Sequence, residues 1–283
     1  MKKSTSIMVV IGLAVIFLAS TAFAYQGRKI TETFDKKSRI KISTVSGDCI
    51  VKKGTTDKIE VEVENSYTPQ DNFEAELYES GKTLHLAELI HGNTRGGAIW
   101  TITAPDGIKI EFSTASGRLV IRGLQGEFEA STASGEIEII DCGGEFHFST
   151  ASGDISARNC TGAFDLSTAS GEIMASSVTL DEPGSFSTAS GTAEVHPAKT
   201  PEFNLSVSSA SGSAIVDYDG NPVKGTFEFT AKKRNGEIDA PFAFDHEEEF
   251  RRYGDRYVRK TFTKETDGPL IEISTASGEA ILK

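Results

Sequence analysis

The chain of 283 residues has few cysteines, histidines and basic residues, and each shortage excludes a class of protein. Its three cysteines are too few for a disulfide-rich scaffold, and none has the CxxC spacing of a zinc site. The five histidines are scattered, and no HExxH, GxSxG or SxxK motif occurs. With 29 basic against 41 acidic residues, the formal net charge of −12 disfavours nucleic acid as a partner. The sequence therefore predicts no enzyme, no metal site and no cofactor.

Long apolar runs are also missing beyond the first two dozen residues. Lys2 and Lys3 precede an apolar run of about 12 residues from Ile7 to Leu18, and small residues ending in Ala24 follow. This layout is typical of a secretory signal peptide, since roughly 20 apolar residues are needed to span a bilayer. We expect cleavage after Ala24, with retention as an anchor as the alternative, and no stable membrane span afterwards. The predicted location is the periplasm or the cell surface.

What the chain does contain is a repeated pentapeptide. STASG begins at residues 113, 131, 149, 167, 187 and 274, with looser copies STVSG at 43 and SSASG at 208. The glycines at 117, 135, 153 and 171 are separated by eighteen residues, and those at 191 and 212 follow after twenty and twenty-one. A catalytic nucleophile needs one pocket, whereas a constant step indicates one structural unit per repeat.

The residues around each pentapeptide predict short strands that stack in parallel. Apolar and polar residues alternate with period two on both sides of the motif, as in GEFEASTASGEIEI. Like residues recur at the same offset, including the column Ile110, Phe128, Phe146 and Phe164. Columns of similar residues on successive coils predict an all-β fold: a single-stranded, right-handed parallel β-solenoid with coils of about 18 residues and irregular terminal caps.

The pentapeptide is interpreted as the corner of each coil. We expect its glycine to adopt a positive φ, which residues with a Cβ resist. The small hydroxyl residues before it can bond to neighbouring backbone or to the next coil. The alternation leaves open whether Thr132 or Ala133 points inward. The predicted structural corners are Gly47, Gly117, Gly135, Gly153, Gly171, Gly191, Gly212 and Gly278.

Two of the cysteines share one column of the repeat. Cys142 and Cys160 are eighteen residues apart, so neighbouring coils would bring their Cα atoms to about 4.8 Å, within the range of a disulfide. The alternative is a pair of free thiols that pack as small hydrophobic groups. Cys49 occupies a position that holds Ile or Leu in other copies, which indicates a core residue.

The residue after the corner glycine forms a partly acidic column. Its members are Arg118, Glu136, Asp154, Glu172 and Thr192. Stacked carboxylates can form a calcium ladder, but the calcium-binding nonapeptide repeat is missing and solvent can screen an exposed row. We expect a solvated acidic face.

The ends of the stack are less regular than its middle. The predicted organisation is a signal peptide at 1–24, a cap with irregular first coils at 25–104, regular coils at 105–219, and an excursion with a final coil at 220–283. In that excursion, TFEFTAKKRNGEIDA predicts a β-hairpin with its turn at Asn235 and Gly236. The charged stretch DHEEEFRRYGDRYVRK follows, and its predicted partner contacts are Phe250, Arg251, Arg252, Tyr253 and Tyr257.

The stretch TAPDGIKIEFSTASGRLVIRGLQGEFEASTASGEIEI resembles a bacterial exported family named for a "putative adhesin" domain of unknown function. In that family a proline-containing strand leads into repeated coils with S-G corners. The resemblance covers residues 40–283 and implies a parallel β-solenoid in a cell-envelope setting. It implies no catalytic residues.

These features predict a non-catalytic exported protein, adhesin-like or structural, that acts as an interaction module of the cell envelope. The expected partner is an envelope protein or polysaccharide, and self-association is a further expectation. Two alternatives remain open at this point. A carbohydrate-active β-helix enzyme would need a groove lined by the irregular regions. A self-assembling envelope scaffold would join coils end to end through exposed strand edges.

Overall fold

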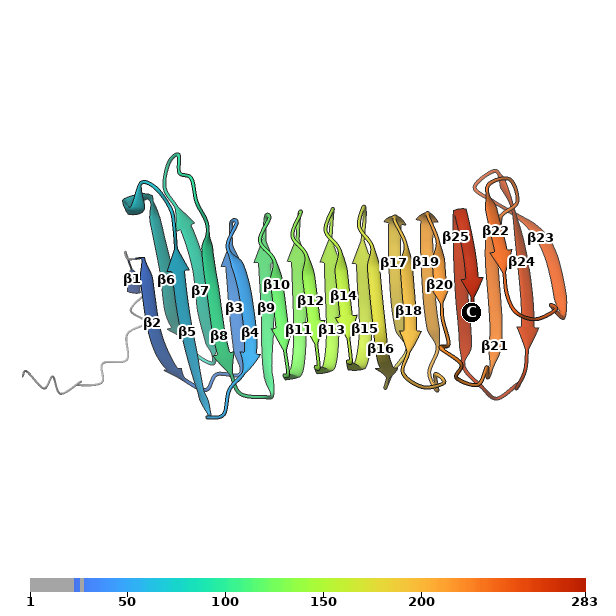
Figure 1. Cartoon of the computed structure of the whole chain (residues 1–283), viewed down its shortest axis with the longest axis horizontal. Helices are drawn as coiled ribbons and strands as arrows, with labels where there is room; N and C mark the ends of the chain where they lie inside the picture. Colours follow the sequence, from blue (N-terminus) through green and yellow to red (C-terminus); the bar gives the residue numbers. More distant parts are fainter. Residues whose placement is uncertain (1–22, 26–27) are drawn as a thin grey trace, which may run out of the picture.

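The computed structural model describes residues 23–25 and 28–283, and in this part the chain is all-β apart from one short 3-10 helix, η1 (Figure 1). The strands form one long stack in which the first and last parts of the chain lie at opposite ends. Within the described residues, no helix is long and apolar enough to cross a membrane. Most of the predicted signal segment, residues 1–22, lies outside the described residues, so its cleavage stays a prediction.

The N-terminal end of the stack mixes antiparallel and parallel strands. Here β6 pairs antiparallel with β7, and β5 lies antiparallel between β2 and β8. Parallel pairing starts where β3 meets β7 and where β4 meets β8. The elements of this end are β1 (Phe23–Tyr25), β2 (Lys29–Asp35), β3 (Arg39–Thr44), β4 (Asp48–Lys53), β5 (Lys58–Asn65), η1 (Gln70–Asn72), β6 (Phe73–Ser80), β7 (Thr83–Ile90) and β8 (Ala98–Ala104).

The middle of the stack is parallel throughout, and each strand pairs with the equivalent strand of the next repeat. Phe128 of β11 lies beside Ile110 of β9 and Phe146 of β13, so partners along this column are eighteen residues apart, as the repeat predicts. The strands of the middle are β9 (Ile108–Thr114), β10 (Leu119–Arg122), β11 (Gln125–Thr132), β12 (Ile137–Ile140), β13 (Gly143–Thr150), β14 (Ile155–Arg158), β15 (Thr161–Thr168), β16 (Ile173–Leu180), β17 (Gly184–Ser190), β18 (Ala193–Pro197), β19 (Leu205–Ser211) and β20 (Ala214–Val216).

The chain alternates between two sheets as it passes each corner. Sheet A runs in spatial order through β1, β6, β7, β3, β9, β11, β13, β15, β17 and β19, and both sheets continue into the C-terminal end. Sheet B contains β2, β5, β8, β4, β10, β12, β14, β16, β18 and β20.

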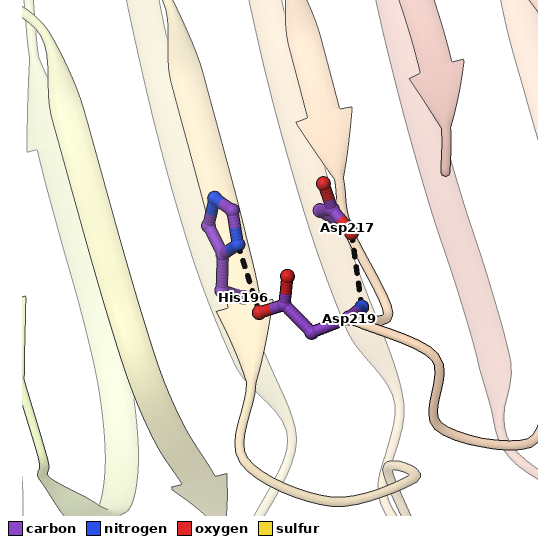
Figure 2. Close-up of side chains that lie close together, drawn as sticks. All are labelled: His196, Asp217 and Asp219. Atoms are coloured by element: carbon purple, nitrogen blue, oxygen red, sulfur yellow. Dashed lines mark hydrogen bonds and ion pairs between the residues drawn. The ribbon is translucent and has the colours of Figure 1, made fainter.

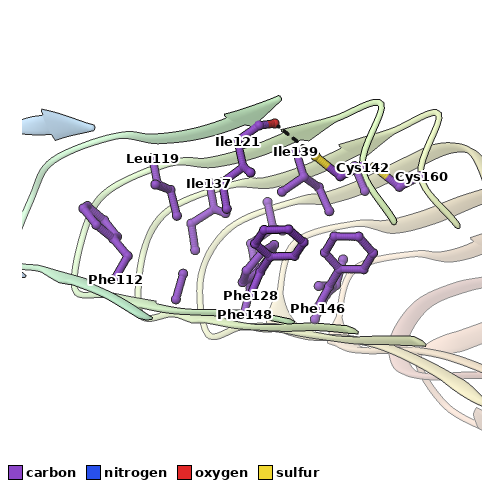
Figure 3. Close-up of a cluster of buried hydrophobic side chains, with 14 of the residues drawn as sticks. Phe112, Leu119, Ile121, Phe128, Ile137, Ile139, Cys142, Phe146, Phe148 and Cys160 are labelled. Carbon is purple, nitrogen blue, oxygen red and sulfur yellow. Dashed lines mark hydrogen bonds between the residues drawn. The ribbon is translucent and has the colours of Figure 1, made fainter. Parts of the chain in front are cut away.

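The core lies between the two sheets and is filled by the predicted columns of like residues (Figure 3). The rings of Phe128 and Phe146 stack with centroids 5.4 Å apart, and those of Phe146 and Phe164 with centroids 5.0 Å apart. On the opposite sheet, Ile137 and Ile155 form the facing column and are buried. Burial of this continuous apolar interior is the main force that holds coil on coil.

The C-terminal end differs from the predicted hairpin at Asn235 and Gly236. β21 (Thr226–Lys232) and β22 (Gly236–Asp239) do not pair with each other: β21 lies in sheet A and β22 in sheet B, and each pairs in parallel with β25 (Leu270–Leu282). The hairpin prediction is wrong because the turn at Asn235 carries the chain from one sheet to the other. The last STASG copy, in β25, therefore inserts between the coil of β19 and β20 and the coil of β21 and β22.

A true hairpin follows and ends sheet A. β24 (Asp255–Thr263) pairs antiparallel with β21, and β23 (His246–Arg252) pairs antiparallel with β24. The end of the core is covered by aromatic side chains from this part of the chain, with the rings of Phe242 and Phe262 stacked at 3.9 Å. Phe242 and Phe244 also meet the ring of Phe229 edge-on.

Candidate functional surface

Each STASG corner carries the chain from sheet A to sheet B, and its threonine points into the core. Thr132, Thr150 and Thr168 are only 6–8% exposed, whereas Ala133 is exposed, which answers the question of direction left open by the sequence. Thr150 Oγ1 accepts a hydrogen bond from the Gly153 N–H at 2.9 Å. From the next coil, Thr168 Oγ1 donates to the Gly153 carbonyl at 3.1 Å. The hydroxyl row thus ties each corner internally and to its neighbour.

The corner glycines are needed for a different reason from the one predicted. Gly47, Gly117, Gly135, Gly153 and Gly171 do not have a left-handed φ, so the prediction of positive φ is wrong for them. It holds at Gly191, Gly212 and Gly278, with φ between 139° and 150°. A Cβ on Gly153 would lie 1.9 Å from the carbonyl oxygen of Gly135, and one on Gly135 would lie 1.9 Å from that of Gly117. In these regular coils, close approach of stacked backbones excludes a side chain.

A further column of left-handed residues lies at the opposite corner of the regular coils and was not predicted from the sequence. Gly123, Asp141, Asn159 and Ser177 are spaced by eighteen residues and have φ between 55° and 70°. Asp and Asn tolerate this conformation better than other residues with a side chain. Asn159 Nδ2 also donates to Asp141 Oδ1 at 3.1 Å. The sequence signal that could have revealed this corner is a column of glycine, aspartate, asparagine and serine that recurs every eighteen residues.

The first corner of the stack is closed by a buried carboxylate. Glu88, at the end of β7, is 5% exposed. Its Oε2 accepts backbone N–H bonds from Val45 (2.6 Å), Ser46 (3.0 Å) and Gly47 (3.2 Å). Its Oε1 accepts a further bond from the Tyr67 hydroxyl at 3.0 Å. Desolvation is the main cause that raises the pKa of Tyr67 to about 12, so this hydroxyl stays a donor.

The cysteines are free thiols, and the disulfide alternative for Cys142 and Cys160 is not formed in the structure. Both lie buried in adjacent coils of one column, where the thiol of Cys142 donates to the Ile140 carbonyl and that of Cys160 to the Arg158 carbonyl. Burial raises the pKa of Cys160 to about 11, which disfavours the reactive thiolate. Cys49 is fully buried in the core, as predicted.

A row of serines crosses the outer face of sheet A, one from each STASG copy. Strand register places each serine beside the next, and the hydroxyl oxygens of Ser43 and Ser113 lie 3.2 Å apart. This serine row consists of Ser43, Ser113, Ser131, Ser149, Ser167, Ser187, Ser208 and Ser274, all exposed or half-buried. Its side chains point away from the core because successive residues of a strand alternate between faces.

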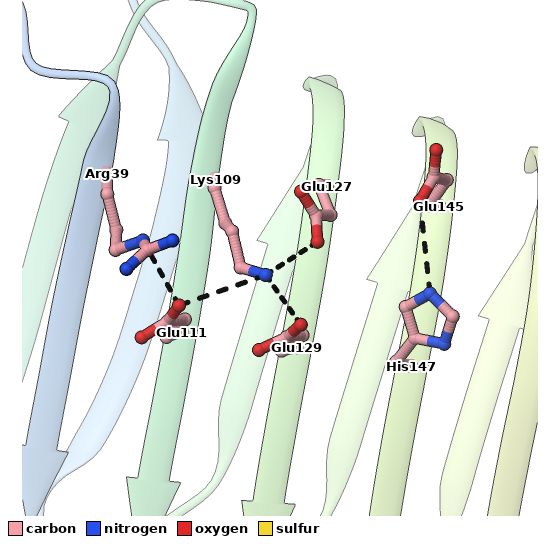
Figure 4. Close-up of polar contacts among 7 residues, drawn as sticks. All are labelled: Arg39, Lys109, Glu111, Glu127, Glu129, Glu145 and His147. Carbon is pink, nitrogen blue, oxygen red and sulfur yellow. Dashed lines mark hydrogen bonds and ion pairs between the residues drawn. The ribbon is translucent and has the colours of Figure 1, made fainter.

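Charged side chains form parallel rows on the same face of sheet A (Figure 4). Lys109 Nζ lies 2.6 Å from carboxylate oxygens of both Glu127 and Glu129, and Arg39 Nε lies 3.1 Å from Glu111. The hydrogen bonds to Glu127 and Glu129 raise the pKa of Lys109, and the same lysine lowers the pKa of Glu129. Lys109 and Glu129 therefore stay charged near neutral pH.

The outer face of sheet A is hollowed at several places along these rows. One hollow of about 410 Å³ is lined by Lys41, Glu111, Phe112, Ser113, Glu129, Ala130, Ser131, His147 and Ser149. A second lies beside it over the corners and is lined by Thr44, Ser113, Thr114, Ala115, Ser131, Thr132 and Ala133. Hydroxyl, carboxylate and amine groups line the first hollow, so it can exchange hydrogen bonds with a polar ligand.

The column that could form a calcium ladder instead makes ordinary contacts. Arg118 binds Glu138 at 2.6 Å and lies 3.6 Å from Glu136. Asp154 Oδ1 accepts the backbone N–H of Glu172 at 2.8 Å.

Residues 107–240 match the family model described as Toastrack DUF4097. The resemblance predicted from the repeated corners is thereby confirmed over this Toastrack segment, which is shorter than the predicted span of 40–283. The segment begins just before β9 and ends just after β22, so it contains the regular coils but neither the Glu88 cap nor the last STASG copy. No curated protein matches the chain.

Three solved structures are similar to the chain at low identity. A "putative cell adhesion protein" from Clostridium sporogenes is 13% identical, with 90% of this chain and 98% of that one covered and a TM-score of 0.25. A "putative adhesin" from Bacteroides fragilis is 15% identical over 88% and 96%, with a TM-score of 0.48. A "putative adhesin" from Parabacteroides merdae is 18% identical over 68% and 89%, with a TM-score of 0.38. All three TM-scores are below 0.5, so the fold stands on the strand pairing of this chain.

One group of side chains in the Toastrack segment has the composition of a cation site (Figure 2). One ligand atom from each of His196, Asp217 and Asp219 lies within 4.8 Å of the others. His196 already contacts Asp219 through Nδ1 and Glu194 through Nε2, both at 3.1 Å. A cation would have to displace these contacts. His196 and Asp217 directly follow Val195 and Val216, which are register partners 21 residues apart and so lie outside the eighteen-residue period.

The predicted partner contacts lie outside the Toastrack segment, on the β23–β24 hairpin. Phe250 stacks on Tyr257 with ring centroids 5.7 Å apart, and Tyr253 at the hairpin turn is 90% exposed. Arg252 lies over the Tyr253 ring, whereas Arg251 lies opposite Arg256 on β24. A third hollow on the outer face of sheet A is lined by Ser206, Glu228, Thr230, Phe250, Arg252, Arg259, Glu272, Ile273 and Ser274. The hairpin and the serine row thus share one face.

Proposed function

We propose that the protein is a non-catalytic, exported, adhesin-like module of the cell envelope that binds an envelope polysaccharide along the outer face of sheet A. In this proposal the coils of about 18 residues form a single-stranded, right-handed solenoid that serves as a rigid support. The observation that carries the proposal is the serine row, which presents one hydroxyl per strand over eight neighbouring strands in strict register.

The length and spacing of the serine row suit an extended polymer better than a small molecule. Parallel strands are about 4.8 Å apart, so the row extends over roughly 34 Å from Ser43 to Ser274. The three hollows lie along this same face rather than in one enclosed cavity. A ligand with regularly repeated polar groups can meet several of these sites at once, and several weak contacts then add to useful affinity.

The chemistry of the face favours a neutral or amine-bearing polysaccharide. Serine hydroxyls both donate and accept hydrogen bonds, as sugar hydroxyls do. Glu111, Glu129 and Asp165 lie in the neighbouring row of the same face. With a net charge of −12 for the chain, these carboxylates would repel a strongly anionic polymer at low salt.

Matched substitutions on the two faces of one coil test the binding surface. Ser149 lies on the outer face of sheet A and Ser156 on that of sheet B. Ser149→Arg should weaken binding to purified envelope polysaccharide at least tenfold in calorimetry, whereas Ser156→Arg should leave it unchanged. Equal effects of both variants, or no binding by the unaltered protein, would overturn the proposed surface.

Export is tested separately by fractionating cells that produce the full chain. The proposal expects the protein in the periplasm or on the cell surface, with a mass that corresponds to cleavage after Ala24. Uncleaved protein confined to the cytoplasm would contradict it.

A further inference from the structure

The outermost strand of sheet A, β23, has one unpaired edge. It pairs with β24 on one side, and no strand among the described residues pairs with its other side. Six of its seven residues are exposed. An exposed edge presents backbone N–H and C=O groups that can pair with another strand, and proteins usually block such edges.

The sequence of β23 is complementary in charge to itself when read in the opposite direction. Its last five residues are Glu248-Glu249-Phe250-Arg251-Arg252, with two acidic residues before the phenylalanine and two basic residues after it. When two copies pair antiparallel about a two-fold axis through Phe250, Glu248 lies opposite Arg252 and Glu249 lies opposite Arg251. Both copies contribute, so the pairing contains four Glu–Arg pairs around a Phe–Phe pair.

Neighbouring registers fit less well. A two-fold axis must pass through a residue of the strand, because residues opposite each other have to lie on the same face of the sheet. With the axis through Glu249, the glutamates themselves meet at the centre and only Glu247 faces Arg251. With the axis through Arg251, two arginines meet at the centre. The register about Phe250 therefore maximises opposite-charge pairs.

In the single chain one carboxylate lies opposite the basic half of β23: Asp255 faces Arg252, but it binds Lys232 at 2.7 Å. Within the described residues, neither Arg251 nor Arg252 forms an ion pair, and Arg251 lies directly opposite Arg256 on β24. Like charges directly opposite each other are destabilising. The acidic half is attached to neighbouring strands, since Glu248 binds Arg259 at 3.0 Å and Glu249 binds Lys233.

We propose that two copies of this chain pair through the free edges of β23, antiparallel about Phe250, so that sheet A continues from one molecule into the other. Glu248, Phe250 and Arg252 then lie on the outer face beside Arg259, and Glu249 and Arg251 on the opposite face. The dimer places two serine rows on one continuous face. This pairing is independent of the polysaccharide proposal, because it is measured by mass rather than by ligand binding.

Charge reversal followed by mixing tests the pairing. By light scattering after gel filtration, the unaltered full-length protein should have twice the monomer mass. Arg251→Glu/Arg252→Glu and Glu248→Arg/Glu249→Arg should each be monomeric alone, and an equimolar mixture should form a one-to-one dimer. The control Lys52→Glu/Arg122→Glu, two exposed cations on sheet B far from β23, should stay dimeric. An unaltered protein that is monomeric at all concentrations, or variants that stay dimeric alone, would overturn the proposal.

A cysteine at the axis tests the register. Opposite Cα atoms in an antiparallel pair lie about 4.5–5.5 Å apart, within reach of a disulfide. Phe250→Cys should form a covalent dimer under mild oxidation, whereas Arg251→Cys, which faces Glu249 of the other copy, should not. The native cysteines are buried and do not compete. Equal cross-linking of both variants, or none with Phe250→Cys, would overturn the register.

Discussion

The first corner of the stack and the interior corners have the same sequence pattern, but their backbone N–H groups find different hydrogen-bond acceptors. At an interior corner, the N–H groups of Ala133 and Ser134 donate to the carbonyls of Thr114 and Ala115 in the preceding coil. At the first corner, the equivalent groups of Val45 and Ser46 donate to the buried carboxylate of Glu88. A repeat thus supplies the partners of every corner except the first, which needs a dedicated side chain.

Substitution of the glycine at an interior corner should cause the largest loss of stability. Gly153→Ala places a Cβ against the Gly135 carbonyl and should lower the free energy of unfolding by about 3 kcal/mol in urea titration. The matched control is Gly123→Ala at the opposite corner, where φ is +70° but the nearest atom outside the adjoining residues, Lys53 Cβ, lies 3.7 Å from the added Cβ. That variant should lose only about 1 kcal/mol. If Gly123→Ala were the more damaging, close approach would not explain the repeated glycines.

Substitution of the inward-pointing threonine should cause the next largest loss of stability. Thr150→Val keeps the shape of the side chain but removes the acceptor for the Gly153 N–H, so unfolding free energy should fall by about 1.5 kcal/mol. Urea titration of the full chain measures this loss. A neutral result would mean that the hydroxyl row does not hold the corners.

A smaller effect is expected at the left-handed corner. Asn159 has a φ of 55°, so Asn159→Ala should cost about 1 kcal/mol. Asn159→Gly, which accepts this φ freely, should stay close to the unaltered protein in thermal unfolding. Equal losses in both variants would point to the bond with Asp141 instead of the backbone conformation.

The second serine of the pentapeptide, which precedes the glycine, should have the smallest effect on stability. Ser152 is exposed at its corner, so Ser152→Ala should change the unfolding free energy by less than about 0.5 kcal/mol. A loss as large as that of Thr150→Val would contradict the division of the motif into inward and outward residues.

The sequence predicted the features that the repeat itself encodes. The columns of Phe128 and Ile137 follow from a constant period and alternation, and the structure confirms them. The reason for glycine was wrong at most corners, because a sequence does not distinguish a required dihedral from a close contact. Asn235 and Gly236 suggested a hairpin, since local turn chemistry carries no information on which strand lies next to β21.

The parts of the candidate surface that were missed depend on contacts outside the repeat. In the sequence, Glu88 is one polar residue among others in an alternating strand. Only the fold shows that it lies under the first corner. His196 meets Asp219 because Asp219 lies in the turn after β20, where the eighteen-residue repeat has ended. The serine row, in contrast, is evident in the sequence as a serine that recurs in every copy of the motif. The face on which it lies follows only once the threonine is known to point inward.

Amide hydrogen exchange in Glu88→Ala tests the central claim most directly, because it reports on each corner separately. Removal of the carboxylate leaves the N–H groups of Val45, Ser46 and Gly47 without their acceptor. The predicted result is exchange at least tenfold faster at 45–47 than in the unaltered protein, with exchange at 133–135 much less affected. Unchanged exchange at 45–47, or equal acceleration at both corners, would contradict the claim that Glu88 replaces a missing coil.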